Sequence, residues 1–76
     1  MEINVADMGQ KLALLRGNKT LAEVANDLRI SKSALAMYET GRRIPRDQIK
    51  IRIAEYYGKS VAYIFFNGEE HDSCSN

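Results

Sequence analysis

Three arginines lie within five residues of one another, at Arg42, Arg43 and Arg46, and could bind an anionic partner. Gly41 precedes them and Pro45 lies among them, so we expect an exposed loop here rather than a helix. The two arginines that directly follow a helix would also be favoured by its dipole alone. An ordinary charged loop and an anion-binding loop therefore both fit this segment.

The distribution of charge supports a polyanionic partner without proving one. The net charge is only +1, but residues 1–66 contain all 11 Lys and Arg against seven Asp and Glu, a balance of +4. Residues 67–76 contain three acidic residues and no Lys or Arg. The sequence thus predicts a basic domain over residues 1–66 and an acidic, disordered tail over residues 67–76.

Catalysis and metal binding have little support in the sequence. The only histidine, His71, and the only cysteine, Cys74, both lie in the acidic tail. No nucleophile–base pair can therefore be assembled in the rest of the chain, and a metal site would need ordered ligands. We expect no enzymatic activity, no cofactor and no metal.

The cytoplasm is the expected compartment. Residues 1–7 are acidic and lack the apolar segment of a signal peptide. No apolar run approaches the ~20 residues of a membrane-spanning helix. A single cysteine permits no internal disulfide, whereas small extracellular domains usually carry several.

Capping residues and glycines predict five short helices, and therefore an all-α fold. Asp7 is a candidate N-cap for the first helix, and Thr20 with Glu23 fits a capping box for the second. Ser31 and Ser60 are candidate N-caps for the third and fifth. With the N-cap included wherever one is named, the expected helices span residues 7–16, 20–28, 31–40, 46–57 and 60–66.

The fourth of these segments is ambiguous in its hydrophobic period. Ile49, Ile51 and Ile53 alternate with basic residues, which suits a half-buried strand. Ile49, Ile53 and the Tyr56–Tyr57 pair suit one face of a helix equally well. We predict a helix, because about twelve residues between a proline and a glycine is long for a strand.

The second and third helices are separated by only three residues, 29–31, so the chain turns sharply and the third helix protrudes. Its outward residues are small, polar or flexible, and such a helix can enter a DNA major groove about 12 Å wide. A solvated helix face is the alternative. The inward positions that would fix the angle between the two helices are Val24, Ala25, Leu28, Ile30, Leu35 and Tyr38.

Residues 21–35, LAEVANDLRISKSAL, and residues 38–45, YETGRRIP, resemble the helix-turn-helix family of phage repressors and Cro proteins. This family is also called the xenobiotic-response-element (XRE) family of bacterial and phage regulators. The resemblance extends through IAEYYGKSV at residues 53–61 and covers residues 8–66 in all. It implies a five-helix, lambda-repressor-like domain whose third helix reads double-stranded DNA.

The resemblance also implies which residues contact DNA. Lys32 can donate to guanine, Ser33 can bond to any base edge, and Met37 can contact a thymine methyl group. Arg16 corresponds to a family arginine that pairs with Glu39, which we interpret as a structural pair. The implied base-reading residues are Lys32, Ser33, Ala36 and Met37. The implied phosphate-binding residues are Thr20, Thr40, Arg42 and Arg43, helped by the backbone N–H groups that begin the second helix.

The sequence departs from the family pattern at three points. Leu21 stands where the family often has a phosphate-binding glutamine, so one phosphate contact is expected to be missing. Arg29 stands where a glycine is common, so it must either adopt a positive φ or form a different turn. The connection between the first two helices is slightly short.

Two functions remain open on the sequence alone. The first is a sequence-specific transcriptional regulator, expected to be a homodimeric repressor of bacterial or phage origin associated with the nucleoid. The second is an antitoxin-like or protein-interaction module of the same fold. We expect most of the aromatic side chains to be core and one or two to form a dimer contact: Tyr56, Tyr57, Tyr63, Phe65 and Phe66.

Overall fold

The computed structural model describes residues 3–66, and these form five α-helices without a strand. None of the helices in this part of the chain is long and apolar enough to cross a membrane. The all-α prediction is therefore confirmed, while His71, Cys74 and the acidic residues 67–76 lie outside the described residues. The helices are α1 (Val5–Arg16), α2 (Leu21–Leu28), α3 (Lys32–Glu39), α4 (Asp47–Tyr57) and α5 (Val61–Phe65).

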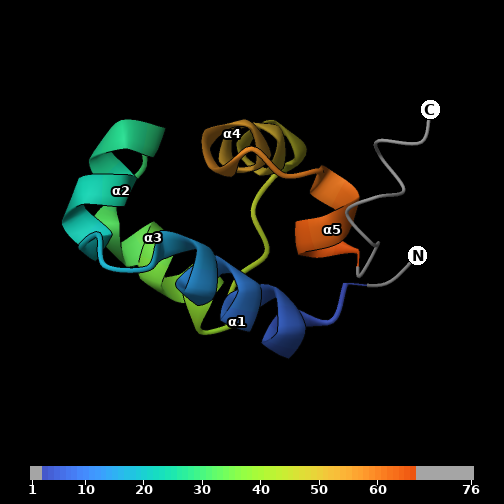
Figure 1. Ribbon diagram of the computed structural model, residues 1–76. Helices are drawn as coiled ribbons and strands as arrows, with labels where there is room; N and C mark the ends of the chain where they lie inside the picture. Colours follow the sequence, from blue (N-terminus) through green and yellow to red (C-terminus); the bar gives the residue numbers. More distant parts are fainter. Residues whose placement is uncertain (1–2, 67–76) are drawn as a thin grey trace.

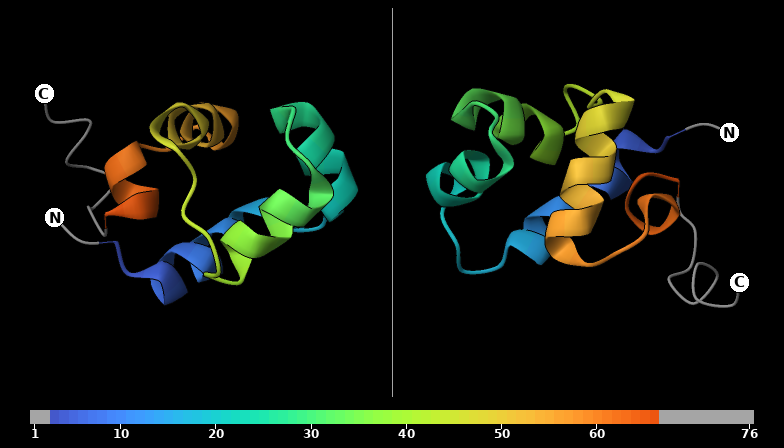
Figure 2. Two further views of the ribbon diagram at one scale, coloured as in Figure 1. Left: turned by 180° about the vertical axis from the view of Figure 1, so that it is seen from behind. Right: turned by 90° about the horizontal axis from the view of Figure 1, so that it is seen from above.

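The five helices pack around a single hydrophobic core, and Figures 1 and 2 show how they are arranged. Helix α1 packs against α3 and α5, while α2 packs against α3 and α4, and α4 against α5. The segment between α3 and α4 crosses from one side of the molecule to the other (Figure 1). The buried apolar residues are Met8, Leu12, Val24, Ala25, Leu28, Leu35, Tyr38, Ile53, Ala54, Ile64 and Phe65.

Side-chain caps begin most of the helices where the sequence places them. The Thr20–Glu23 capping box is present, and the Ser31 and Ser60 side chains cap α3 and α5. The prediction of Asp7 as the first N-cap is wrong. The N-cap is Asn4, whose Oδ1 accepts a hydrogen bond of 3.1 Å from the Asp7 N–H, so α1 begins three residues earlier than expected.

The fourth segment is a helix, as predicted, and the strand alternative is excluded. Its buried positions, Lys50, Ile53 and Ala54, follow a helical spacing, whereas Ile51 is 51% exposed. Gly58 ends the helix in the left-handed region, with φ of 69°.

The turn between α2 and α3 places Arg29 in the left-handed region, with φ of 61° and ψ of 42°. Within residues 3–66 it is the only non-glycine residue with a positive φ. The turn thus has the left-handed conformation for which the related sequences often use a glycine, although an arginine occupies the position here. The fold tolerates the backbone strain that this causes.

Candidate nucleic-acid interface

Helix α3 has one buried face and one open face. Leu35 and Tyr38 are buried against the core, while Lys32 and Ser33 are exposed at the N-terminal turn of the helix. Ala36 and Met37 lie on the open side and are half-buried. All four predicted base-reading residues therefore share the outward side of α3.

A hollow on this side brings predicted base-reading and phosphate-binding residues together. Its lining residues are Ser33, Ala36, Met37, Thr40 and Arg42. A surface of this composition offers both apolar contacts and a guanidinium group. Lys32 does not line the hollow, and it projects from the first turn of α3.

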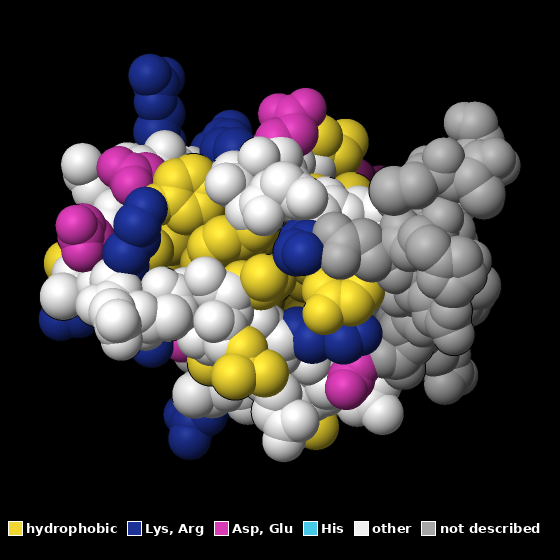
Figure 3. Space-filling model, in the orientation of Figure 1, with side chains coloured by type: hydrophobic (Ala, Val, Ile, Leu, Met, Phe, Trp, Pro, Cys, Tyr) yellow, Lys and Arg dark blue, Asp and Glu magenta, His cyan; other side chains and the backbone are white. Residues whose placement is uncertain are grey.

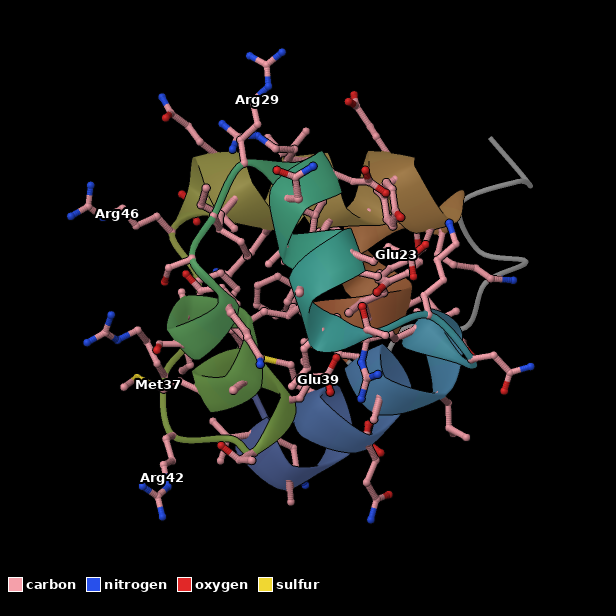
Figure 4. The ribbon with its side chains drawn as sticks, turned by 90° about the vertical axis from the view of Figure 1, so that its left-hand side faces the viewer. Glu23, Arg29, Met37, Glu39, Arg42 and Arg46 are labelled. Carbon is pink, nitrogen blue, oxygen red and sulfur yellow. The ribbon has the colours of Figure 1, made fainter. Side chains whose placement is uncertain are left out.

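The loop after α3 is held close to the helix end by backbone hydrogen bonds. The N–H groups of Arg42 and Arg43 both donate to the Met37 carbonyl, at 2.9 and 3.3 Å. Both side chains are exposed. Figure 4 shows Arg42, Met37 and Arg46 projecting from the same side of the molecule, whereas Arg29 projects from another edge.

The Thr40 hydroxyl is already engaged as a donor. Its Oγ1 donates to the Ala36 carbonyl at 2.9 Å, with the Met37 carbonyl also within 3.3 Å. A hydroxyl has one proton to donate. Thr40 must therefore change its hydrogen-bond acceptor before it can donate to a phosphate.

The start of α2 retains free donors. Thr20 Oγ1 accepts from the Glu23 N–H at 3.0 Å, and the Thr20 N–H donates to Glu23 Oε1 at 3.2 Å. Within residues 3–66 the N–H groups of Leu21 and Ala22 have no acceptor, and the Thr20 hydroxyl proton is also unused. Such donors at a helix N-terminus suit an anion, although the Glu23 carboxylate reduces the positive potential.

Leu21 is half-buried and packs against the core. It is partly exposed, and its apolar side chain supplies no hydrogen bond to a phosphate. Any anion at this end of α2 would be bound by the helix backbone and by Thr20.

Several side chains that sequence reasoning missed hold α2 and α4 together. Arg52 Nη1 donates to the Leu28 carbonyl at 2.7 Å, at the C-terminal end of α2. The Tyr56 hydroxyl donates to Asp27 Oδ2 at 2.7 Å and accepts from Lys19 Nζ at 3.1 Å. This hydrogen bond to Tyr56 raises the pKa of the Lys19 ammonium group. These contacts fix the orientation of α2, which in turn supports α3.

Gly9 allows α1 to approach the end of α3 closely. A Cβ atom at this position would collide with the Glu39 carbonyl group. The approach also brings Arg16 on α1 to the Glu39 carboxylate, and their hydrogen bonds raise the pKa of the Arg16 guanidinium. The predicted pairing of Arg16 with Glu39 is thus confirmed.

Basic side chains project around the end of the molecule that α2 and α3 form, with acidic side chains among them (Figure 3). This end lies opposite α5 (Figure 1). The surface around α3 is therefore mixed in charge, and its basic character is concentrated in the loop that follows the helix.

Comparison with known proteins supports the same interpretation. A family model described as helix-turn-helix matches residues 11–64, which include α2, α3, α4 and all the predicted site residues. No match to the chain was found among curated proteins. Two helices joined by three residues, with the second presenting an open face, form the arrangement that such proteins insert into a DNA groove. The protein therefore belongs to the XRE-type helix-turn-helix family and is a double-stranded-DNA-binding transcriptional regulator.

Proposed function

We propose that the protein is a repressor that binds a two-fold symmetric operator as a homodimer. The observation that carries the proposal is the hollow along α3, where Ser33, Ala36 and Met37 adjoin Thr40 and Arg42. A base edge would contact the apolar side chains of this hollow, while a flanking phosphate would bind Arg42.

The two groups of residues in the proposed interface have different roles. Lys32 and Ser33 donate hydrogen bonds to bases, and Ala36 and Met37 contact thymine methyl groups. Thr20 and Thr40, with Arg42 and Arg43, bind phosphates on the two sides of the groove. Phosphate contacts set the register of α3, and base contacts select the sequence.

The length of α3 supports a homodimer. Eight residues form a helix about 12 Å long, which reaches only a few base pairs. Two copies related by a two-fold axis would read half-sites about 34 Å apart and gain both affinity and specificity. Tyr63 and Phe66 remain half-buried at α5 and are candidates for a dimer contact.

A repressor of this kind acts on the chromosome, so we expect the protein to be associated with the nucleoid in the cytoplasm.

Selection of bound duplexes from a random DNA pool at near-physiological salt tests the proposal. Enrichment of a palindrome with half-sites about one helical turn apart is the expected result. Enrichment of a single short site would contradict the homodimer. Weak, salt-sensitive binding without enrichment would favour the antitoxin-like or protein-interaction alternative, with a protein as the main partner.

A further inference from the structure

Met37 places an accessible thioether in the hollow along α3. The side chain is half-buried and lines the hollow together with Ser33, Ala36, Thr40 and Arg42. Figure 4 shows it projecting outward from α3, on the same side of the molecule as Arg42. The hollow has a volume of about 490 Å³, whereas one water molecule occupies about 30 Å³. Water and small dissolved molecules therefore reach the residues that line it.

The second methionine in the described part of the chain is protected. Met8 on α1 is only 1% exposed and belongs to the hydrophobic core. The third methionine, Met1, lies outside the described residues. Because an oxidant must touch the sulfur atom, a thioether in the core reacts only when the fold opens, whereas Met37 reacts in the folded protein. The structure thus distinguishes the two methionines by their access to a dissolved oxidant.

Oxidation changes the chemical character of a methionine side chain. Hydrogen peroxide transfers one oxygen atom to the sulfur: the sulfur lone pair forms an S–O bond, the O–O bond breaks, and the remainder of the peroxide leaves as water. The sulfur is oxidised by two electrons and the peroxide is reduced by two. The product, methionine sulfoxide, is polar, and methionine sulfoxide reductases reverse the reaction.

A sulfoxide at position 37 opposes DNA binding in two ways. Its polar oxygen replaces the apolar surface that the thioether offers to a thymine methyl group. It also accepts hydrogen bonds, and the Ser33 hydroxyl and the Arg42 guanidinium are donors that line the same hollow. Ser33 lies one helical turn before Met37, a spacing at which side chains meet. Donors that bind the sulfoxide are withdrawn from the base and the phosphate.

We propose that Met37 is a reversible oxidation site, at which peroxide converts the thioether to a sulfoxide and thereby weakens the binding of DNA. The oxidation site follows from the access to Met37 and from the burial of Met8. Its effect on DNA binding rests on the proposed function, in which α3 enters the major groove. The DNA-binding face then responds directly to the oxidant.

The first test compares the oxidation of Met37 and Met8 in the folded protein without DNA. The full chain carries Cys74→Ser, so that oxidation of the thiol does not interfere. After timed exposure to hydrogen peroxide and removal of the oxidant with catalase, mass spectrometry of fragmented peptides measures the sulfoxide at each methionine. Met37 should be oxidised well before Met8, and thermal unfolding should match the untreated protein because Met37 lies outside the core. Oxidation of Met8 as fast as Met37 would overturn the assignment.

The second test measures DNA affinity before and after the same treatment, with the duplex selected by the wild-type protein. Oxidation of both protomers removes two apolar contacts, so it should weaken binding about tenfold. The loss should follow the fraction of sulfoxide at Met37. Methionine sulfoxide reductases A and B, which together reduce both sulfoxide epimers, should restore the affinity. Bound duplex should in turn protect Met37 from oxidation.

Met37→Leu is the matched control for the second test. Leucine keeps an apolar side chain of similar volume but carries no sulfur. Each protein is compared with its own untreated sample, so an effect of the substitution on binding itself cancels. Peroxide should leave the affinity of Met37→Leu unchanged. An equal loss in both proteins would assign the effect to another residue and overturn the proposal.

The outcomes distinguish failure of this proposal from failure of the proposed function. If Met37→Leu binds too weakly for the comparison, partial reduction of the oxidised wild type replaces it, and recovery that follows Met1 rather than Met37 would contradict the proposal. If Met37 is oxidised first but affinity does not change, oxidation of Met37 does not control DNA binding. If the untreated protein selects no duplex, the proposed function fails together with the effect on DNA, while the order of oxidation still decides the modification site.

Discussion

The Arg16 guanidinium donates two hydrogen bonds to the Glu39 carboxylate, from Nε to Oε2 at 2.8 Å and from Nη2 to Oε1 at 3.1 Å. Glu39 is the last residue of α3, where the helix dipole disfavours a negative charge. Only 7% of its side chain is exposed, so water contributes little to its solvation. The Arg16 Nη1 also donates to the Lys19 carbonyl at 2.7 Å, which links the end of α3 to the turn before α2.

Replacement of Arg16 should therefore destabilise the fold through the carboxylate that it leaves behind. We expect Arg16→Met to lower the free energy of unfolding by about 2–3 kcal/mol at neutral pH, less than for a fully buried pair, because Arg16 is itself partly exposed. Chemical denaturation gives the value. The double variant Arg16→Met with Glu39→Gln should recover much of the loss. If the effects of the two single variants simply add, the pair is not coupled.

The parts of the fold that the sequence predicts correctly depend on short-range signals. Thr20, Ser31 and Ser60 are each followed three residues later by the N–H that they cap, so these helix starts can be read from local sequence. The first helix start was predicted wrongly because Asn4 and Asp7 are both good N-caps. Only the extended backbone at Asn4 distinguishes them.

The site is less predictable than the fold because the side chains that support it form contacts between residues distant in sequence. Tyr56 and its partner Asp27 are 29 residues apart, and Arg52 reaches a carbonyl 24 residues away. No local pattern identifies such contacts. The outward face of α3 could be predicted from its periodicity, but the engagement of the Thr40 hydroxyl by the Ala36 carbonyl depends on side-chain geometry.

The strained backbone at Arg29 gives a second prediction. An L-residue in the left-handed region is destabilised by roughly 1–2 kcal/mol, and glycine relieves this at some cost in chain entropy. Arg29→Gly should therefore raise the free energy of unfolding by about 0.5–1 kcal/mol, measured by chemical denaturation. Arg29→Ala is the control and should give no gain, because alanine retains the Cβ atom. Equal stabilisation by both variants would show that loss of the charge is responsible.

Tyr57 should make stability depend on pH in the alkaline range. Burial, with a contribution from the Glu39 carboxylate, raises the pKa of Tyr57 to about 12 from its ordinary value of 10.0. The unfolded chain therefore loses this proton first, and the stabilisation that is present below pH 10.0 is lost as the pH rises toward 12.

Tyr57→Phe tests this dependence directly. The wild-type hydroxyl is buried without a hydrogen-bond partner in the described residues, so its removal should stabilise the protein by about 1 kcal/mol at neutral pH. The advantage of the variant over the wild type should increase between pH 10 and 12. Denaturation at pH 7 and pH 11 measures both differences. An advantage that does not change with pH would show that Tyr57 titrates normally.

Two variants of the DNA-binding face should distinguish a residue that positions the protein on the DNA backbone from a residue that recognises a base. Arg43→Ala removes a proposed phosphate contact from each protomer of the dimer, so it should weaken binding to all duplexes to a similar degree and reduce the salt slope by about two. Lys32→Ala removes a proposed base contact and should relax the preference at one position of each half-site, by about 1–3 kcal/mol. Repeating the duplex selection with each variant supplies the comparison. Because α3 places Lys32 on its open face and Arg43 follows the helix in the loop, the two effects should differ in kind. If both variants kept the wild-type base preference, the proposed placement of α3 in the major groove would be wrong.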